Sequence, residues 1–506
     1  MVRRTQSHTP GHGAGHSAGH SAGHSAGHSA GHSAGVSRGR AKRPVDGGRA
    51  RSVDGGKRPA KANASGDGYV GGRGAGEAPS VALQGPRAAS SLVAVRQRDA
   101  ALPTGRKALV INSGSSSIKF QVRVEGGKSL VSGKVERIGE AEGKLTLKVA
   151  GKSFELSRPI QDHEEGLRLL VAALTDPARG AMKLEELAAV GHRVVHGGPR
   201  FREPVRIDAA VEASIDEYAK LAPLHNPPAL AGIRAVRSVL GQIPQVAVFD
   251  TAFHATLPEE ATSYALPREW RDEGVRRYGF HGISVQNATA RAAQLLGRPL
   301  EQTNLIVCHL GNGASITAVE HGKSRDTSMG MTPLAGITMG TRPGDVDVGV
   351  VFHMARQGLS LQQIESDLSN RSGLLGLSDG LSNDVRELLA AEAKGDEHAR
   401  LALEKYTEDI TEQIGAFLAK LRGDVHAIVF TGGVGENSGV IRERIVSHLA
   451  AFGYTLDKRK NGGEGSLGVD DADISPTRAH KRVLVLRADE EGAIGEAAFQ
   501  LTPQRS

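Results

Sequence analysis

Two segments of this chain repeat one pattern at a distance of 197 residues. Aligning KALVINSGSSSIKFQV with TNLIVCHLGNGASITAV places Asn112 opposite His309 and Gly114 opposite Gly311. Each segment reads as a strand, a tight glycine-rich loop and a second strand. A chance match between two common strand and loop patterns is one explanation. The other is a duplication, which predicts two similar lobes that each offer a backbone-lined loop to a shared ligand.

The chain after Lys107 alternates between strand and helix patterns. Short apolar runs such as ALVIN, QVAVFDTAF, NLIVCHL and HAIVFTGG are separated by DHEEGLRLLVAAL, IDAAVEASIDEYAKL and ALAGIRAVRSVLG, whose apolar residues have helical spacing. This alternation predicts an α/β protein.

The first hundred residues differ from the rest in composition. The unit AGHS recurs from His12 to Val36, and Gly, Arg, Pro and Ala follow without helical or strand periodicity. Such a segment buries too little apolar surface to offset the entropy of ordering, so we expect residues 1–105 to be a disordered basic tail. Its histidines would also suit weak binding of metals or polyanions, but a low-complexity extension is the simpler interpretation.

Charge, cysteine content and hydropathy exclude several protein classes. Residues 1–100 carry 15 Lys or Arg and 5 Asp or Glu, whereas the whole chain has a net charge of +7, so the basic balance belongs to the tail and indicates no specific nucleic-acid partner. Cys308 is the single cysteine, which excludes an intrachain disulfide. No apolar run reaches about 18 residues, so we expect a cytoplasmic protein without a membrane partner.

Two of the glycine-rich loops have the composition of phosphate-binding turns. The segment NSGSSSIK lacks the Walker pattern, but its backbone N–H groups and hydroxyls can converge on phosphate oxygens, and Lys119 adds a point charge. In AIVFTGGVGENSG the strand ends at Thr431, and Gly432 and Gly433 permit close approach of a ligand. Alone, the GGVGEN loop also fits a plain strand-to-helix turn. Together with the loops NSGSSSIK and HLGNG, it indicates a nucleotide site.

Two arginines and one histidine are candidates for the acceptor side of a transfer reaction. Arg193 and Arg342 directly follow apolar strand-like runs, and a guanidinium donates two parallel hydrogen bonds to carboxylate or phosphoryl oxygens. Either arginine could equally pair with a nearby acid such as Asp345. His281, in RRYGFHGIS, fits a structural loop histidine as well as a catalytic one.

Ten motifs in order resemble those of the acetate and butyrate kinase group, within the actin, Hsp70 and sugar kinase superfamily. From Lys107 to Ala498 they are VINSGSSSIK, GHRVVHGG, LAPLHNPPAL, FDTAFH, RRYGFHG, VCHLGNGAS, DTSMGMTPLAGITMGTRPGD, SNDVREL, FTGGVGENS and ADEE. Pro343 departs from a common serine, and Ile283 and Val285 replace the usual threonine and histidine. Neither departure removes a catalytic group.

The resemblance implies a fold and an assembly. It predicts two actin-like, ribonuclease H-like lobes with the active site between them. The first lobe would span residues 106–251 and be completed by residues 490–506, and the second would span residues 252–489. The resemblance also implies a homodimer, although no residue identifies its interface.

The resemblance assigns roles to the residues that match its motifs. Arg193 and His225 would bind acetate, Arg342 and His281 would stabilise the transferring phosphoryl group, and Asp250 matches an essential aspartate. Asn112 and Glu490 would hold Mg²⁺, or Mn²⁺ in its place. The ATP or ADP contacts would come from Ser115, Ser117, Lys119, His309, Leu310, Gly311, Asn312, Gly313, Asp384, Val385, Arg386, Gly433, Val434, Gly435, Glu436 and Asn437.

The implied reaction is reversible, Mg²⁺-dependent transfer of a phosphoryl group from ATP to acetate, giving acetyl phosphate and ADP. Acetate is an anion at pH 7, so the transfer needs no strong base, and we interpret Asp250 as orienting Arg193, Arg342 or hydrated Mg²⁺. A propionate or butyrate kinase is the nearest alternative. A sugar or polyol kinase, in which Asp250 would be a base, and a non-catalytic nucleotide-binding protein are more distant ones.

Overall fold

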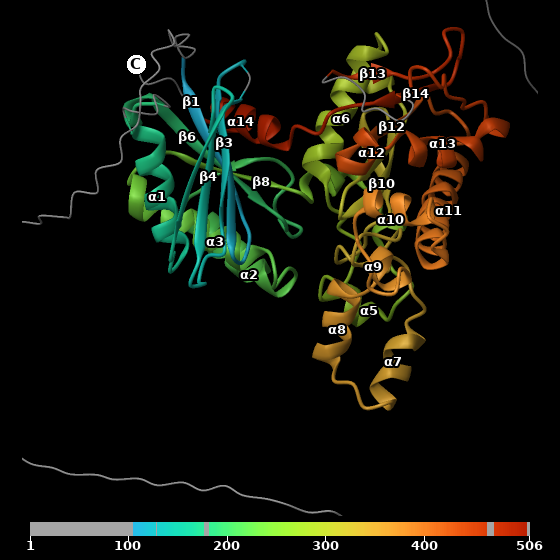
Figure 1. Cartoon of the computed structure of the whole chain (residues 1–506), viewed down its shortest axis with the longest axis horizontal. Coiled ribbons are helices and arrows are strands. Elements are labelled where there is room, and N and C mark those ends of the chain that lie inside the picture. The colour runs from blue at the N-terminus through green and yellow to red at the C-terminus, as the bar shows by residue number, and fades with distance from the viewer. Residues whose placement is uncertain (1–104, 128, 177–181, 463–469, 503–506) are drawn as a thin grey trace, which may run out of the picture. The chain divides into compact units, whose positions relative to one another are not determined.

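Two β-sheets organise the part of the chain that the computed structural model describes, residues 105–127, 129–176, 182–462 and 470–502 (Figure 1). The α/β class predicted from the alternation of patterns is confirmed. The expected tail, apart from residue 105, lies outside the described residues. Within the described ranges, no helix combines the length and apolar character needed to cross a membrane.

The first sheet has the order β5-β4-β3-β2-β1-β6-β8-β7. Its strands are β1 (Lys107–Ser113), β2 (Ser117–Val124), β3 (Ser129–Glu136), β4 (Gly143–Val149), β5 (Lys152–Arg158), β6 (Leu187–Val194), β7 (Val205–Arg206) and β8 (Gln245–Phe249). The second sheet has the order β11-β10-β9-β12-β14-β13. Its strands are β9 (Leu305–Leu310), β10 (Ala314–Glu320), β11 (Lys323–Thr327), β12 (Ala427–Thr431), β13 (Ala472–Asp473) and β14 (Arg482–Val485).

Both sheets contain the same arrangement of five strands. In the first sheet β1 pairs antiparallel with β2 and parallel with β6, and β2 and β6 pair in turn with β3 and β8. In the second sheet β9 takes the place of β1, with β10 and β11 on one side and β12 and β14 on the other in the same orientations. The repeated order favours duplication over a chance match of two hairpins.

Helices cover both faces of the first sheet. They are α1 (His163–Thr175), α2 (Ala209–Glu217), α3 (Asn226–Leu240) and α14 (Glu490–Gln500). Helices α1 and α3 share a core with one face, whereas α14 packs on the opposite face of β1, β6 and β8. The three helical runs expected in this region are confirmed as α1, α2 and α3. The Asp162 and Asp208 carboxylates cap α1 and α2 by accepting backbone N–H groups in the first turn.

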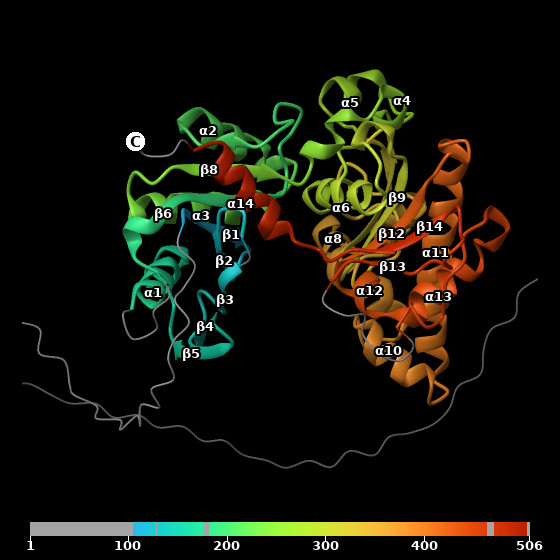
Figure 2. The ribbon, with the colours of Figure 1, turned by 90° about the horizontal axis from the view of Figure 1, so that it is seen from above.

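The remaining helices belong to the second half of the chain. They are α4 (Glu259–Thr262), α5 (Arg268–Asp272), α6 (Gly282–Leu295), α7 (Gly349–Arg356), α8 (Leu361–Asn370), α9 (Gly373–Leu377), α10 (Val385–Glu392), α11 (Glu397–Lys420), α12 (Gly432–Asn437) and α13 (Gly439–Ser447). Short 3₁₀ helices lie at Leu184–Glu186, Tyr218–Lys220, Ala252–Thr256, Leu300–Gln302 and Ala450–Phe452. Figure 2 shows α6 and α11 on opposite sides of β9 and β12.

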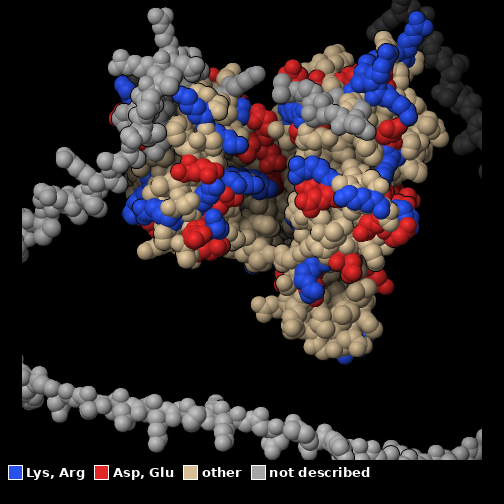
Figure 3. Space-filling view, viewed as in Figure 1, with Lys and Arg blue, Asp and Glu red and all other residues tan. Residues whose placement is uncertain are grey.

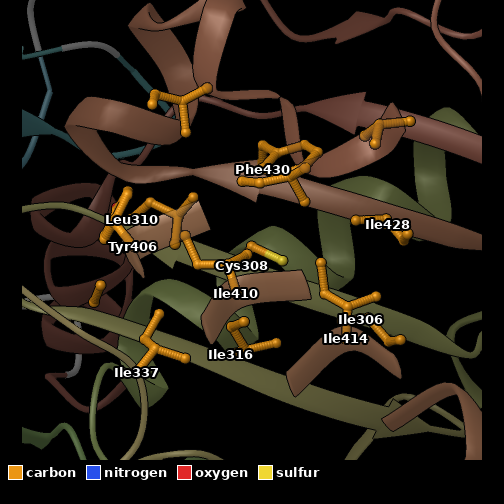
Figure 4. Packing of buried hydrophobic residues seen from close by; sticks show 14 of the residues in the cluster. Ile306, Cys308, Leu310, Ile316, Ile337, Tyr406, Ile410, Ile414, Ile428 and Phe430 are labelled. Carbon is orange, nitrogen blue, oxygen red and sulfur yellow. The ribbon is translucent and has the colours of Figure 1, made fainter. Parts of the chain in front are cut away.

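The largest core cluster lies between the second sheet and α11. Ile410, Ile414 and Phe417 recur at helical spacing on α11 and pack against inward-facing residues of β9 and β12, such as Cys308 and Phe430 (Figure 4). Fully burying one such side chain stabilises the fold by roughly 1.5–3 kcal/mol, so this cluster holds rigid the strands whose ends carry the site.

Candidate active site

The loop between β1 and β2 is closed by backbone hydrogen bonding. The Gly114 N–H donates to the Ser117 carbonyl (2.8 Å), and the Gly114 carbonyl lies 2.8 Å from His163 Nε2. Ser115 and Lys119 are exposed, and Ser117 is half-buried. Within the described residues, no hydrogen bond or ion pair links these three predicted phosphate contacts to the second sheet, so their meeting with the other loops stays a prediction.

The matching hairpin of β9 and β10 differs in one respect from the alignment of the two segments. Six residues separate the paired positions Asn112 and Lys119 in the first hairpin, whereas five separate His309 and Ser315 in the second. The alignment therefore holds up to the loops and slips by one residue after them. As a result, the position opposite the strand-end residue is Lys119 in the first hairpin and Ser315 in the second.

Gly432 brings the third loop against the second. Its φ is +79°, and a Cβ there would lie 2.8 Å from the Leu310 carbonyl oxygen and 3.1 Å from the Leu310 nitrogen. Only glycine fits this approach without a shift of backbone. The close contact joins the ends of β9 and β12, which are parallel neighbours in the sheet.

Glu436 supports this loop from within. Its Oε1 accepts hydrogen bonds from the N–H groups of Gly432 (3.0 Å) and Ala488 (2.8 Å), and its Oε2 lies 3.1 Å from Arg487. Asn437 donates to the Gly433 carbonyl (2.8 Å). Both side chains hold the backbone of the loop, and the nucleotide contact expected for them stays a prediction.

A cavity of about 600 Å³ joins three of the predicted nucleotide segments. Its lining includes Gly311 and Asn312 of the second loop, Asp384, Val385 and Arg386, and Gly433, Val434 and Asn437 of the third loop. Leu374, Asn383 and Ser438 to Val440 also line it and were not predicted. Its volume is of the size that proteins use for small ligands, roughly 300–1,000 Å³.

Asp384 marks the start of α10 beside this cavity. Its carboxylate accepts from the Arg386 N–H (2.8 Å) and forms an ion pair with the exposed Arg386 side chain (2.5 Å), which lowers the pKa of Asp384. The Val385 side chain, between these two residues in the sequence, is buried in the core of the second half of the chain.

Arg193 is held by carboxylates at the end of β6. Its Nε and Nη2 donate to the two oxygens of Asp250, at 3.1 and 2.5 Å, while its Nη1 lies 3.5 Å from Asn112 Oδ1 and its Nε 3.7 Å from Glu490 Oε2. Burial alone would lower the pKa of Arg193, but Asp250 and Glu490 outweigh it and raise the pKa. For Asp250 burial has the opposite effect and raises the pKa of the carboxyl group, whereas the nearby Arg193 lowers it.

These residues meet because their strands are parallel neighbours. Asn112, Arg193 and Asp250 lie at or just after the carboxyl ends of β1, β6 and β8, which point the same way and share one sheet edge. Ligands of open α/β sheets bind at such edges.

Arg342 has no carboxylate partner among the described residues. Its Nη1 donates to the Pro333 carbonyl (2.9 Å), and burial lowers its pKa. The neighbouring acid, Asp345, instead accepts from the Gly336 N–H (2.7 Å). The pairing with Asp345 considered from the sequence is therefore wrong, and a cation without a counter-charge faces the second loop.

His281 converges with Arg342 on Gly313. A Cβ on Gly313 would lie 3.2 Å from Arg342 Nη2 and 3.4 Å from His281 Nε2, so the glycine leaves room for a small group between two donors. His281 directly precedes α6 and has a left-handed backbone conformation, with a φ of +59°. Its ring stacks on His309, with centroids 4.3 Å apart and planes inclined by 30°.

The site keeps its histidines neutral at pH 7. Burial, with the nearby cations Arg193 and Arg342, lowers the pKa of His225 and His281. Burial also lowers the pKa of His309 to about 4. His225 directly precedes α3, and its place in the acetate site stays a prediction.

Two replacements noted in the sequence fill cores. Ile283 and Val285 lie on opposite sides of α6, in the cluster with α14 and in the cluster with the second sheet respectively. Both are buried, so the apolar side chains here serve packing.

Sequence reasoning missed several residues that support the site. Arg442 is buried and donates to the Gly435 carbonyl (2.7 Å), and Arg123 binds the carboxylate of Asp489, the residue before Glu490. Ser284 and Ser315 contact the two stacked histidines. Arg123, Ser284 and Arg442 lie outside the ten motifs, and Ser315 ends the motif VCHLGNGAS without having been assigned a role.

Comparisons with known proteins agree with this geometry. Residues 107–496 match the Acetokinase family. A relative from Thermotoga maritima named acetate kinase is 48% identical over 389 residues, which is 76% of this chain and 96% of the relative. Another acetate kinase, from Bacillus mycoides, is 46% identical over 399 residues, which is 78% of this chain and 98% of the relative.

Solved structures give the same result. The crystal structure of Porphyromonas gingivalis acetate kinase is 41% identical with a TM-score of 0.74, and that of a Francisella tularensis propionate kinase is 37% identical with a TM-score of 0.72. Each match covers 78% of this chain and 100% of the other. The family resemblance read from ten motifs is thereby confirmed, and the chain belongs to the acetokinase family.

Proposed function

We propose that this chain is an acetate kinase that transfers a phosphoryl group reversibly and in line between ATP and acetate. The observation that carries the proposal is the convergence of Arg342 and His281 on Gly313, beside the Arg193 and Asp250 pair. An enzyme that joins two anions needs this concentration of donors and positive charge.

The acceptor would lie against Arg193. Asp250 occupies the Nε and Nη2 edge of this guanidinium, whereas Nη1 makes only a long contact to Asn112 Oδ1 (3.5 Å), so a second anion would bind at Nη1. The neutral His225 nearby adds a polar contact without a further charge. Acetate is ionised at pH 7, so Asp250 has no proton to remove and serves to orient Arg193.

The donor would span the loops of the second sheet. The nucleoside fits the cavity of about 600 Å³, and its phosphates would extend past Gly311 to Gly313 toward Arg342 and His281. Ser115, Ser117 and Lys119 would reach the phosphates from the first loop after the two lobes approach each other.

Asn112 and Glu490 suit Mg²⁺ or Mn²⁺ as oxygen donors. Both lie within 3.7 Å of Arg193, and the described residues contain no cluster of three or more acidic, His or Cys side chains that could hold a metal. This donor set fits an ion that keeps water and takes further ligands from phosphates. When bound, such an ion would neutralise charge on the phosphates.

The two-lobe division also remains our proposal. All strands of the first sheet precede residue 251, and α14, which begins at Glu490, packs on that sheet. These contacts support a first lobe of residues 106–251 completed by residues 490–506, and a second lobe of residues 252–489. We expect the protein in the cytoplasm, where ATP is supplied.

A homodimer is supported by an apolar patch on α7 and α8. We define this α7–α8 patch by Val346, Val348, Val350, Phe352 and Leu361, whose exposed fractions run from 43% to 70%. Figure 3 shows few charged atoms over these helices at its lower end, and α7 itself has no buried residue. Apolar patches of this kind on soluble proteins mark interfaces.

A second copy of this chain fits the patch by charge. Asp347 and Arg356, both exposed, lie near opposite ends of α7. If two α7 helices pair antiparallel about a two-fold axis, each Asp347 faces the partner's Arg356.

The test of the activity is a coupled steady-state assay with MgATP and acetate, propionate, butyrate or glycerol. We expect the highest kcat/KM with acetate. Arg193→Ala should raise KM for acetate and Arg342→Ala should lower kcat, each by about 100-fold or more, because a charge-assisted hydrogen bond is worth roughly 1.5–3 kcal/mol and each guanidinium would donate more than one to its anion.

The control is Arg268→Ala, which removes an exposed arginine on α5 and should leave both constants unchanged. Preference for a longer acid would keep the mechanism and change the substrate, since one methylene changes binding by only about 1–3 kcal/mol. Turnover with glycerol alone, or none at all, would contradict the proposal.

A further inference from the structure

Two buried serine hydroxyls contact the two stacked histidines of the site. Ser315 Oγ lies 2.9 Å from His281 Nδ1, and Ser284 Oγ lies 2.8 Å from His309 Nδ1. Ser284 is 2% exposed and Ser315 is 0% exposed. The two contacts are equivalent, although one serine lies on α6 and the other on β10.

The direction of both hydrogen bonds follows from the surroundings of the hydroxyls. Among the described residues, neither hydroxyl has another hydrogen-bond partner. If the imidazole donated to the serine, the hydroxyl hydrogen would be buried without an acceptor, which folded proteins avoid. Each serine therefore donates, and each Nδ1 accepts.

An accepting Nδ1 decides where a neutral imidazole carries its proton. One ring nitrogen of a neutral histidine is a donor and the other an acceptor, so the proton of His281 and of His309 lies on Nε2. His281 Nε2 faces the space at Gly313, next to Arg342 Nη2. The opposite tautomer would present a lone pair to an anionic phosphate oxygen and repel it.

We propose that Ser315 and Ser284 are positioning residues that hold His281 and His309 as neutral Nε2–H tautomers, so that both rings donate hydrogen bonds to phosphoryl oxygens during transfer. The identity of the acceptor oxygens rests on the proposed function, whereas the two tautomers rest only on the structure. Neutral donors stabilise charge that develops on the phosphoryl oxygens, and release of the product anion does not require breaking an ion pair with them.

The direct test is long-range ¹H–¹⁵N NMR of the full chain labelled with ¹⁵N-histidine at pH 7, with His281→Ala and His309→Ala used to assign the signals. We expect the Nε2–H pattern for both rings in the unmodified protein. In Ser315→Ala, only His281 should become a mixture of tautomers, and in Ser284→Ala only His309.

Kinetics supply the second readout. Ser315→Ala should lower kcat by about 3- to 10-fold, the equivalent of one neutral hydrogen bond, and leave KM for acetate within about 2-fold. Ser315→Thr keeps a hydroxyl and should restore the tautomer and most of kcat. The matched control is Ser328→Ala, which removes a buried hydroxyl that accepts from the Ile316 N–H and contacts neither histidine.

The outcomes separate this inference from the proposed function. A proton on Nδ1 of His281, a doubly protonated ring at pH 7, or an unchanged tautomer in Ser315→Ala would overturn it. If the Nε2–H patterns are found and depend on the serines, but no acceptor supports turnover, the tautomer assignment stands and the proposed function fails.

Discussion

Asp250 is the residue whose role the geometry defines most sharply. Both of its oxygens accept from Arg193, and it is 1% exposed. For Asp250→Asn we expect a 10- to 100-fold rise in KM for acetate, because the loss of one charge-assisted hydrogen bond costs about 1.5–3 kcal/mol. KM for ATP should change little. Steady-state kinetics with each substrate varied in turn would measure both.

The matched control for this change is Asp216→Asn. Asp216 also faces an arginine, Arg234, at 3.4 Å, but on the exposed surface, where such a pair contributes little. If Asp250→Asn lowered kcat alone and left KM for acetate unchanged, a proton-transfer role would replace the orienting role. Near-normal turnover would contradict both.

The sequence predicted individual residues of the site better than it predicted which residues would lie beside them in space. Arg193 could be identified because it follows an apolar run, and strand ends carry ligand groups, whereas Asn112 and Asp250 were assigned by the family resemblance. The sequence did not reveal the strand order, which brings β1, β6 and β8 side by side. Nor could it show that Glu436 and Asn437 bind their own loop, because only the folded backbone decides which carbonyl or N–H lies within reach.

At the scale of elements, the start of α14 connects distant parts of the site. Asp489 caps this helix by accepting from the Gly492 N–H (3.0 Å), and its two oxygens also bind Arg123 of β2, at 2.7 and 3.0 Å. Asn287 of α6 donates to the Asp489 carbonyl (3.1 Å). The next residue is Glu490, so this cap fixes the direction in which Glu490 leaves the helix.

The substitution Asp489→Asn tests the ion pair with Arg123 separately from the cap of α14. Asparagine is as good an N-cap as aspartate, so the helix should keep its start while the charge facing Arg123 is lost. We expect the Mg²⁺ concentration that gives half-maximal activity to rise several-fold, with a loss of stability of about 1–2 kcal/mol at most. Titration of activity with Mg²⁺ and denaturant unfolding would measure the two effects.

Two further variants help to interpret the result of Asp489→Asn. Arg123→Lys keeps the charge but not the two-pronged contact, and it should give a smaller effect in the same direction. Glu496→Gln, about two turns further along α14, is the control, because the one hydrogen bond of the Glu496 side chain within the described residues is from the Gly126 N–H at 3.3 Å. An unchanged Mg²⁺ requirement in Asp489→Asn would show that Glu490 is positioned without this cap.

Helices and central strands were predictable where one pattern dominated. Apolar residues at helical spacing gave α1, α2 and α3, although α3 begins at Asn226, three residues before the run that predicted it. The apolar runs before the glycine loops gave β1, β9 and β12. The edge strand β5 carries mixed, largely exposed side chains, and its neighbour β4 mixes polar with apolar residues, so neither was predicted from the sequence. They are strands because neighbouring strands pair with them, which is a tertiary effect.

For the whole molecule, the resemblance predicted a homodimer without identifying its interface, and we propose the α7–α8 patch as that interface. We expect sedimentation of the full chain to give about twice its mass of 53.0 kDa. Val348→Asp combined with Phe352→Asp should give a monomer, because two buried charges in each half of an apolar interface are costly. The melting temperature of the isolated chain should change little, since α7 has no buried residue.

The control is Leu401→Asp, at an apolar side chain of α11 that is 49% exposed, comparable to the patch residues, but lies outside the patch. It should remain dimeric. Charge supplies a second check, because Asp347→Arg and Arg356→Asp should each weaken the dimer, whereas their combination in one chain restores opposite charges across the two-fold axis and should recover it. A dimer unaffected by Val348→Asp with Phe352→Asp would move the interface to another surface, and a monomeric unmodified chain would mean that the patch has a different occupant.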